Sequence, residues 1–495
     1  MIRLRIAALC ALALAASFLS AQGAAAAPAD AAAPAPAAEN LSRFKLRNGL
    51  ELYVYRDAAV PLARIQLAFR AGAISQGADN AGVFHLYEHL LFRGDGAEGV
   101  KAELARMGAS EWNGGTSAER VSYWLALPSS SLSEGLAFFS RAVLPPADFS
   151  SGLEAEKEVV AQELRSLAAQ PDTIYEAAMT RRLFSKYPWR RDPAGTEKAV
   201  RAATPESLRA LQSTWFVPNN AALFVGGDVD AESVRAEVER LFGSWKAGAD
   251  PWAKPLPPQP RPGVARPAWI VFPDPSLPEG LGAVEARYRG PDLGAQGDQG
   301  AACAAELWGA LLAKPDGRFK SELMKNVPKL YGADSISASY LGQRDGAWIA
   351  VSGYFVVDPA LPAVDRARAF KERSRGFEMT AMRADPKYFS PADYEAARKR
   401  LADARALALD SSGAMVDELA YWWASASVDY FLGFPEALAK CGPKELAAFL
   451  DTYVMRNLEV VAVRMNPADF AKEKRSFEAG GFETIGPENA FWWKR

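Results

Sequence analysis

The chain has 495 residues, of which 49% are hydrophobic and 23% charged, and its formal net charge at pH 7 is -2. That length exceeds what one hydrophobic core usually serves, so two domains of roughly 200 residues are expected. Because lysine and arginine are spread along the chain, the basic surface of a nucleic-acid-binding protein is missing, and no nucleic acid partner is expected.

The N-terminal residues are typical of an export signal. Two arginines precede an apolar run over residues 6–19, and small residues follow, so residues 1–27 are predicted to be a signal peptide. An uncleaved membrane anchor is the less favoured alternative, because the run is shorter than the roughly 20 residues of a membrane-spanning helix. Residues 28–41, rich in alanine and proline, are predicted to be a flexible tether. The protein is therefore expected to be exported, in a bacterium to the periplasm, where Cys303 and Cys441 would form either a disulfide or two buried free thiols.

The first predicted strands follow the tether. Residues 44–55 alternate apolar and polar side chains on both sides of Asn48-Gly49, a dipeptide typical of a tight hairpin. A second strand pattern covers residues 63–69. The folded part is therefore expected to begin with a β-sheet.

A proline-rich segment divides the chain almost evenly. Residues 245–267 disfavour both helix and sheet, and they are predicted to link a domain of residues 42–244 to a second domain of residues 268–495. The halves resemble a diverged repeat, because residues 214–219 ahead of one predicted strand are echoed by residues 452–457 ahead of another. The sequence therefore predicts an α+β fold with two related α/β domains, each a mainly antiparallel sheet packed with helices.

The chain contains two histidines, His85 and His89, and their spacing places both imidazoles on one face of a helix. Glu88 lies beside them, and apolar residues surround all three, so this helix is predicted to be buried and to end before Gly94. Buried polar side chains need partners, and a zinc ion suits two neutral imidazoles, a carboxylate ligand and a fourth position left for water. Taken alone, the histidine pair is equally compatible with a coincidence of the core or the surface.

A second helix is predicted to supply the carboxylate. It begins near Ser151, and its apolar stripe is formed by Leu153, Val160, Leu164 and Leu167. Glu156 and Glu163 fall at the edge of that stripe, two turns apart on the same side of the helix. Two acids beside an apolar face indicate a charged target, and they make metal binding the favoured interpretation of the histidine pair.

The segment His85-Leu86-Tyr87-Glu88-His89, followed by a helix with two glutamates seven residues apart, resembles the motif of the pitrilysin and insulinase family of metallopeptidases, the inverzincins. The family includes the mitochondrial processing peptidases. The resemblance implies that Glu163 completes a zinc site and that Glu88 is the general base. It also implies that Glu156 orients one of the metal ligands without binding the metal itself. It also implies that the chain forms one half of a clam-shell metallopeptidase.

Further segments add to the resemblance. Residues 108–116 resemble the family's Asn-Ala-x-Thr edge strand, which implies that Asn113 and Thr116 bind a peptide substrate, although composition alone would favour an ordinary turn here. Residues 187–196 resemble the family's segment that ends in Gly-Thr, and residues 218–228 resemble its Pro-x-Asn to Gly-Asp strand. The family resemblance thus extends well beyond the histidine motif.

The second half departs from the family pattern. Active members carry an arginine and, seven residues later, a tyrosine that reach the substrate; Tyr331 fits this tyrosine, but Met324 stands where the arginine is expected. In two-chain members the zinc site and the Arg-Tyr pair lie on different subunits. The resemblance therefore implies a homologous partner subunit that supplies the pair, or a homodimer, unless Arg318 or Lys325 substitutes for the arginine.

The predicted function is that of a zinc-dependent endopeptidase, which hydrolyses peptides or unfolded segments with a metal-activated water and Glu88 as the base. Tyr331 is predicted to assist at the substrate. The alternatives are a non-catalytic scaffold or peptide-binding subunit of such an assembly, and a zinc-binding protein without hydrolysis. The intact set of predicted ligands disfavours the first alternative, and Glu88, which a storage site does not need, disfavours the second.

Overall fold

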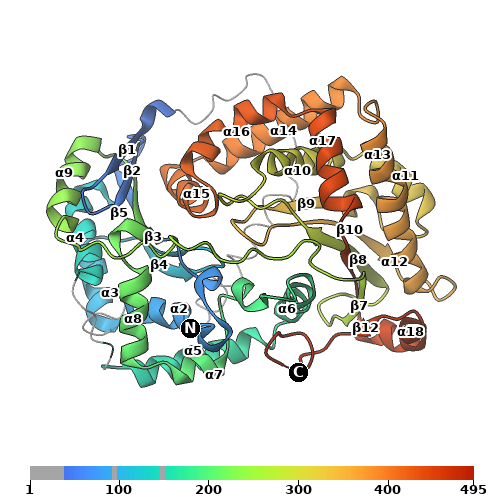
Figure 1. The fold of residues 1–495 in the computed structure, drawn as a ribbon, viewed down its shortest axis with the longest axis horizontal. Helices are drawn as coiled ribbons and strands as arrows, with labels where there is room; N and C mark the ends of the chain where they lie inside the picture. Colours follow the sequence, from blue (N-terminus) through green and yellow to red (C-terminus); the bar gives the residue numbers. More distant parts are fainter. Residues whose placement is uncertain (1–37, 92–96, 145–148, 150, 495) are drawn as a thin grey trace. The chain divides into compact units, whose positions relative to one another are not determined.

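The computed structural model describes residues 38–91, 97–144, 149 and 151–494 (Figure 1). The predicted signal peptide and residues 28–37 of the predicted tether lie outside these ranges. None of the helices in the described part of the chain combines the length and the hydropathy needed to cross a bilayer.

The chain forms two compact units, each built on one sheet of six strands. The first unit comprises the described residues up to Ser166 together with residues 189–257 and 403–432. The second comprises residues 167–188, residues 258–402 and the described residues from Gly433 onward. The units are therefore interleaved along the sequence.

The first sheet begins with the predicted hairpin. Its order is β1 (Leu41–Lys45), β2 (Glu51–Arg56), β6 (Ala221–Gly227), β3 (Leu62–Phe69), β5 (Val121–Pro128) and β4 (Glu111–Thr116). The strands β2 and β6 run parallel, and the other neighbouring pairs are antiparallel. At the hairpin Gly49 adopts a positive φ of 93°, and the Asn48 side chain donates to the carbonyl oxygens of Phe242 and Trp245. The hairpin prediction is thus confirmed, and β1 already starts at Leu41.

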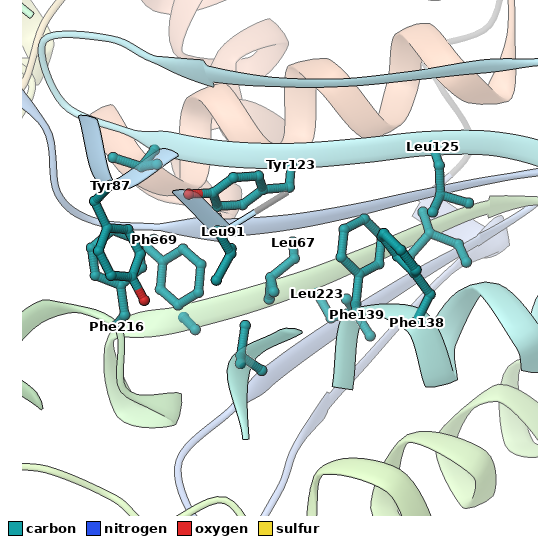
Figure 2. Close-up of a cluster of buried hydrophobic side chains, with 14 of the residues drawn as sticks. Leu67, Phe69, Tyr87, Leu91, Tyr123, Leu125, Phe138, Phe139, Phe216 and Leu223 are labelled. Atoms are coloured by element: carbon teal, nitrogen blue, oxygen red, sulfur yellow. The ribbon is translucent and has the colours of Figure 1, made fainter. Parts of the chain in front are cut away.

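Helices cover both faces of this sheet. The helices wholly within the first unit are α2 (Val83–Leu91), α3 (Ala97–Arg106), α4 (Leu132–Val143), α7 (Glu197–Ala202), α8 (Pro205–Trp215), α9 (Ala231–Phe242) and α15 (Ser412–Ser425). Helix α5 (Leu153–Leu167) belongs to it except for its last residue. Figure 2 shows the core on one face, where Leu67 and Leu223 of the strands meet Phe138 and Phe139 of α4.

The opposite face of the first sheet packs against a helix from late in the sequence. Side chains alternate along a strand, so Ala222 and Phe224 point away from the core that contains Leu223. They pack instead against residues of α15, among them Trp423. Gly226 permits this approach, because a Cβ atom there would lie 2.7 Å from Val416 Cγ2. All residues of β6 are consequently buried.

The second unit repeats the plan of the first. Its sheet order is β12 (Glu483–Thr484), β7 (Ala268–Pro273), β11 (Glu459–Met465), β8 (Leu281–Arg289), β10 (Trp348–Val356) and β9 (Ser337–Leu341). Strand β11 pairs parallel with β7 and antiparallel with β8, just as β6 pairs with β2 and β3. The predicted repeat is confirmed, because residues 214–219 and 452–457 precede these two equivalent strands.

Helices again flank the sheet of the second unit. Those wholly within it are α6 (Pro171–Leu183), α10 (Gln299–Leu312), α11 (Arg318–Asn326), α12 (Ala363–Lys371), α13 (Thr380–Ala384), α17 (Pro443–Leu450) and α18 (Pro467–Ala479). Two further long helices are α14 (Pro391–Ala408) and α16 (Val428–Lys440). Helix α6 comes from the first half of the sequence and is held by the buried Arg287, whose guanidinium pairs with Glu176 at 2.7 Å. Each half of the sequence thus gives one helix to the sheet of the other half.

Two smaller expectations concern the linker and the cysteines. Residues 243–267, all of which the structure describes, contain no helix or strand, as the proline content predicted. Cys303 and Cys441 are buried free thiols within the second unit. The predicted α+β fold, with two related domains that each pack helices on a mixed, mainly antiparallel sheet, is therefore confirmed.

Candidate metal centre

The helix with the two histidines is fixed by its apolar side. The ring of Tyr87 packs on Phe216 with a centroid distance of 3.9 Å, and Figure 2 shows this contact within the core. Phe84 packs edge-on against Trp215. Because these rings lock the rotation of α2, His85, Glu88 and His89 are directed away from the core that holds Tyr87.

A second segment fixes the start of α2. The amide nitrogen of Thr196 donates to the carbonyl oxygen of Ala81 at 3.0 Å. Gly195 has a positive φ of 72°, and a Cβ atom there would lie 2.2 Å from Ala81, so only glycine allows this contact. The Gln76 amide donates to the carbonyl oxygens of Trp189 and Asp192. Residues 187–196, identified from sequence only by resemblance, therefore support the histidine helix.

Three donor atoms converge beside α2. The Nε2 atoms of His85 and His89 are 3.3 Å apart, and Glu163 Oε2 lies 3.8 Å from the first and 3.5 Å from the second. Four ligands held tetrahedrally by zinc at its usual bond lengths lie about 3.3–3.5 Å from one another. Two of the three separations lie in this range, and the third, 3.8 Å, is longer. The two nitrogens and the oxygen form a group that could hold a metal ion, and their donor types suit zinc.

Helix α5 supplies both predicted acids. It begins at Leu153, two residues after the predicted cap, and buries Leu153, Val160 and Leu164. Glu163 therefore reaches the histidines from the edge of that buried stripe. Glu156 lies two turns earlier on the helix, and its Oε1 atom is 3.0 Å from His89 Nδ1. Such a contact leaves the Nε2 lone pair of His89 directed at His85 and Glu163.

The electrostatics of the two imidazoles differ. Burial and the neighbouring His89 lower the pKa of His85 to about 4, so His85 is neutral at physiological pH. Burial also acts to lower the pKa of His89, but its hydrogen bonds to Glu156 and Glu163 outweigh that effect and raise it to about 10. Without a metal ion, His89 therefore carries a proton and a positive charge, which offsets one of the two neighbouring carboxylate charges. His85 Nδ1 has no hydrogen-bond partner among the described residues.

Glu88 lies next to this group and is held by the edge strand. Its Oε2 accepts a hydrogen bond from Thr116 Oγ1 at 3.0 Å. Burial raises the pKa of Glu88 to about 7, although the charge of His89 and the bond from Thr116 act to lower it. A carboxyl group with that pKa can both take up and release a proton near neutral pH.

Gly114 lies against Glu88 and was missed from sequence. A Cβ atom on Gly114 would lie 2.8 Å from Glu88 Oε1 and 3.1 Å from the Tyr123 ring, so a side chain at this position would require the Glu88 carboxylate to shift from where it lies here. The available signal was the Gly114-Gly115 pair, where the family pattern has alanine at the first position. Thr116 donates a hydrogen bond to Glu88, and its contact with substrate stays a prediction.

The remaining predicted residues lie elsewhere. Asn113 is on the edge strand β4, and its side-chain oxygen accepts the amide N–H of Gly114 at 2.9 Å. Tyr331 belongs to the second unit, where its side chain is 67% exposed and its amide N–H donates to the carbonyl oxygen of Tyr354. Met324 on α11 is also exposed, and Arg318 lies over the ring of Tyr388.

Two sequence profiles of known protein families match consecutive parts of the chain. A sequence profile described as "Insulinase (Peptidase family M16)" matches residues 53–197, and one described as "Peptidase M16 inactive domain" matches residues 202–381. Together these matches span most of the chain. The chain therefore belongs to the insulinase family of peptidases, peptidase family M16, as its motifs predicted.

Several curated relatives carry the name of zinc protease. An uncharacterized zinc protease of Rickettsia bellii is 25% identical over 213 residues, which are 42% of this chain and 52% of the relative. The probable zinc protease PqqL of Escherichia coli is 28% identical over 215 residues, covering 41% of this chain and 23% of PqqL. The chain thus matches about half the length, or less, of these curated relatives.

Solved structures share the fold. The first half of the periplasmic protease PqqL from Escherichia coli has a TM-score of 0.69 at 18% identity, covering 90% of this chain and 96% of that one. Pitrilysin has a TM-score of 0.71 at 15% identity, covering 90% of this chain and 49% of its own. Both likenesses support the fold of two related domains.

Proposed function

We propose that this protein is a zinc-dependent endopeptidase, and that His85, His89 and Glu163 hold its metal ion. The observation that carries the proposal is the convergence of the two Nε2 atoms and Glu163 Oε2, which lie 3.3, 3.5 and 3.8 Å apart, the first two distances matching the edges of a zinc tetrahedron. Names of relatives such as the Rickettsia bellii zinc protease support the same metal and the same reaction class.

The side chains around the three donors suit peptide hydrolysis. A bound zinc ion would act as a Lewis acid that lowers the pKa of water to about 7. Glu88, whose own pKa lies at about 7, accepts the proton of the attacking water and delivers it to the amine that leaves. Thr116 fixes one carboxylate oxygen of Glu88, and Glu156 fixes the ring of His89. These contacts hold the reacting groups in place before substrate arrives.

The substrate is proposed to be an extended peptide segment. Strand β4 ends the first sheet, so a peptide can add to it as a further strand and bind through main-chain hydrogen bonds. Asn113, whose side chain holds the Gly114 amide, would release that amide to the peptide. Tyr331 is proposed to contact the substrate from the second unit, and export to the periplasm remains part of the proposal.

Replacing Glu88 by glutamine tests the proposal. The amide keeps the size of the side chain but cannot take a proton, so zinc content should be unchanged and cleavage of an unfolded protein should fall at least a hundredfold, the usual contribution of a general base. Thr116→Val is a graded companion, because it removes only the hydrogen bond to Glu88. Unchanged cleavage by the Glu88→Gln protein would refute this mechanism.

A non-catalytic or partner-dependent subunit is the second candidate. It is favoured by Met324, an exposed residue without a hydrogen-bond donor at the position of the expected arginine. A peptidase assay of the purified protein, alone and mixed with a homologous chain that carries the Arg-Tyr pair, separates the two candidates. Cleavage only in the mixture would assign this chain the metal-bearing role in a pair, and zinc binding without cleavage in either sample would favour the scaffold.

A further inference from the structure

One exposed tryptophan lies on the edge strand of the first sheet. Strand β4 has the sequence Glu-Trp-Asn-Gly-Gly-Thr, and Trp112 is its large apolar residue, with 38% of its surface exposed. The other residues of the strand are small or polar, so the indole is its one large apolar side chain. Its position relative to Glu88 can be worked out from the strand register.

The register shows which residues face the open edge. Ser117 donates its amide N–H to the carbonyl oxygen of Arg120, which makes these two a hydrogen-bonded pair next to the turn. Hydrogen-bonded and non-bonded pairs alternate along an antiparallel ladder, so Gly115 and Asn113 bond to β5. Trp112, Gly114 and Thr116 consequently direct their N–H and C=O groups away from β5. The bond from the Gly114 amide to the Asn113 side chain agrees with this assignment.

The same three residues share the face of the sheet that holds Glu88. Residues two apart on a strand point to one side, and on this side Thr116 donates to Glu88 while the Gly114 Cα is turned toward its Oε1 atom. Trp112 therefore lies one same-face step, about 7 Å, beyond Gly114. The Trp112 indole therefore lies on the same face of the edge strand as the carboxylate of Glu88, the proposed general base on α2.

A peptide that adds to this edge meets these residues in sequence. Directly opposite residues on neighbouring antiparallel strands place their side chains on the same face, within contact distance. The substrate residue opposite Gly114 meets no side chain and lies closest to Glu88. The substrate residue two positions further along faces the Trp112 indole.

Glu111, the one charged residue of β4, does not lie on the face of the strand that carries Trp112. Glu111 is the neighbour of Trp112 on the strand, but its side chain lies on the other face, where it pairs with Arg64 at 3.1 Å and accepts the Trp124 indole N–H at 3.2 Å. The face of Trp112 thus offers an aromatic surface without that carboxylate. Aromatic and large aliphatic side chains gain most from such a cross-strand pair.

We propose that Trp112 determines specificity by selecting an aromatic or large apolar side chain at the substrate residue two positions from the one that pairs with Gly114. This inference rests on the proposed peptidase function and names the class of substrate: extended, apolar segments. In a set of matched peptides, the preferred position should show one fixed offset from the bond that is cleaved.

The test compares peptides that carry phenylalanine or alanine at each position around the cleaved bond. For wild-type protein, one position should give a high phenylalanine-to-alanine ratio of kcat/KM, and Trp112→Ala should lower that ratio about tenfold. Trp112→Phe keeps an aromatic ring and should restore most of the ratio. Leu62→Ala, which removes another exposed apolar side chain of the same sheet, should leave the ratio unchanged.

Binding separates this inference from the proposed function. Zinc-loaded Glu88→Gln protein, with and without Trp112→Ala, is titrated with the same fluorescent peptides. If wild-type protein cleaves peptides but Trp112→Ala keeps the preference, the role of Trp112 is overturned and the peptidase stands. If nothing is cleaved but the phenylalanine peptide binds more tightly only when Trp112 is present, the subsite stands and the peptidase fails. Absence of both cleavage and binding overturns both.

Discussion

Replacement of Glu156 by glutamine should weaken zinc binding while leaving all three proposed ligands in place. Glu156 Oε1 lies 3.0 Å from His89 Nδ1, and both side chains are 17% exposed. The carboxylate fixes the proton of the ring on Nδ1 and adds negative charge behind the ligand. Glutamine can still accept a hydrogen bond but removes the charge, so the ring is held less firmly and is a weaker donor to the metal.

The expected loss follows from comparable contacts behind metal ligands. Removal of such a partner typically weakens metal affinity 10- to 100-fold, which corresponds to about 1.4–2.7 kcal/mol. Because Glu156 is largely buried, we expect a value near the middle of this range, about thirtyfold. Glu158→Gln is the matched control: Glu158 lies two residues away on the exposed face, with its side chain 61% exposed and paired with Arg201. An exposed pair of this kind contributes little, so the control should stay within about twofold of wild type.

The assay is competition for zinc with a chromophoric chelator at pH 7.5, with circular dichroism to verify that each variant is folded. Glu156→Gln should release zinc at the lower chelator concentration, and Glu158→Gln should match wild type. An affinity for the Glu156→Gln protein within twofold of wild type would refute the proposed role of this carboxylate. Equal losses in both variants would point to a general effect on helix α5 instead.

Two further predictions concern the proton balance and the edge strand. The pKa of His89 is raised to about 10 without metal, so zinc must displace a proton from this ring below that pH. The apparent zinc affinity should therefore increase about tenfold per pH unit between pH 7 and pH 9. An affinity independent of pH, measured with the same chelator, would contradict this. Gly114→Ala would place a Cβ atom 2.8 Å from Glu88 Oε1, and kcat should fall at least tenfold with zinc content unchanged, as the usual share of a positioned base implies. Gly115→Ala is its control, since a Cβ atom there would lie 3.6 Å from the Trp124 ring, and activity equal in both variants would exclude a positioning role for Gly114.

Much of the candidate metal site could be predicted because its signals are local. The spacing of His85 and His89 determines that the rings share one face of α2, and the periodicity of α5 places Glu156 and Glu163 on one side. The hairpin at Asn48-Gly49 and the proline-rich linker are likewise encoded within a few residues. The repeat was visible because the two equivalent inner strands follow similar segments.

Features that depend on tertiary packing could not be predicted. An amphipathic pattern shows that α6 and α15 each bury a face, but it does not tell which sheet they cover, and each one covers the sheet of the other half. The contact of Thr116 with Glu88 depends on how closely β4 approaches α2, and so does the close contact of Gly114 with Glu88. The resemblance placed the strand of Thr116 but not the hydrogen bond that its hydroxyl donates to Glu88.

The central claim is that one zinc ion is held jointly by His85, His89 and Glu163. A crystal structure of the zinc-soaked protein, with anomalous data collected on both sides of the zinc absorption edge, tests it most directly. The account predicts one strong anomalous peak about 2.0–2.2 Å from the Nε2 atoms of both histidines and from a carboxylate oxygen of Glu163. A peak that lacks Glu163 among its neighbours, or that lies away from the two rings, would contradict it.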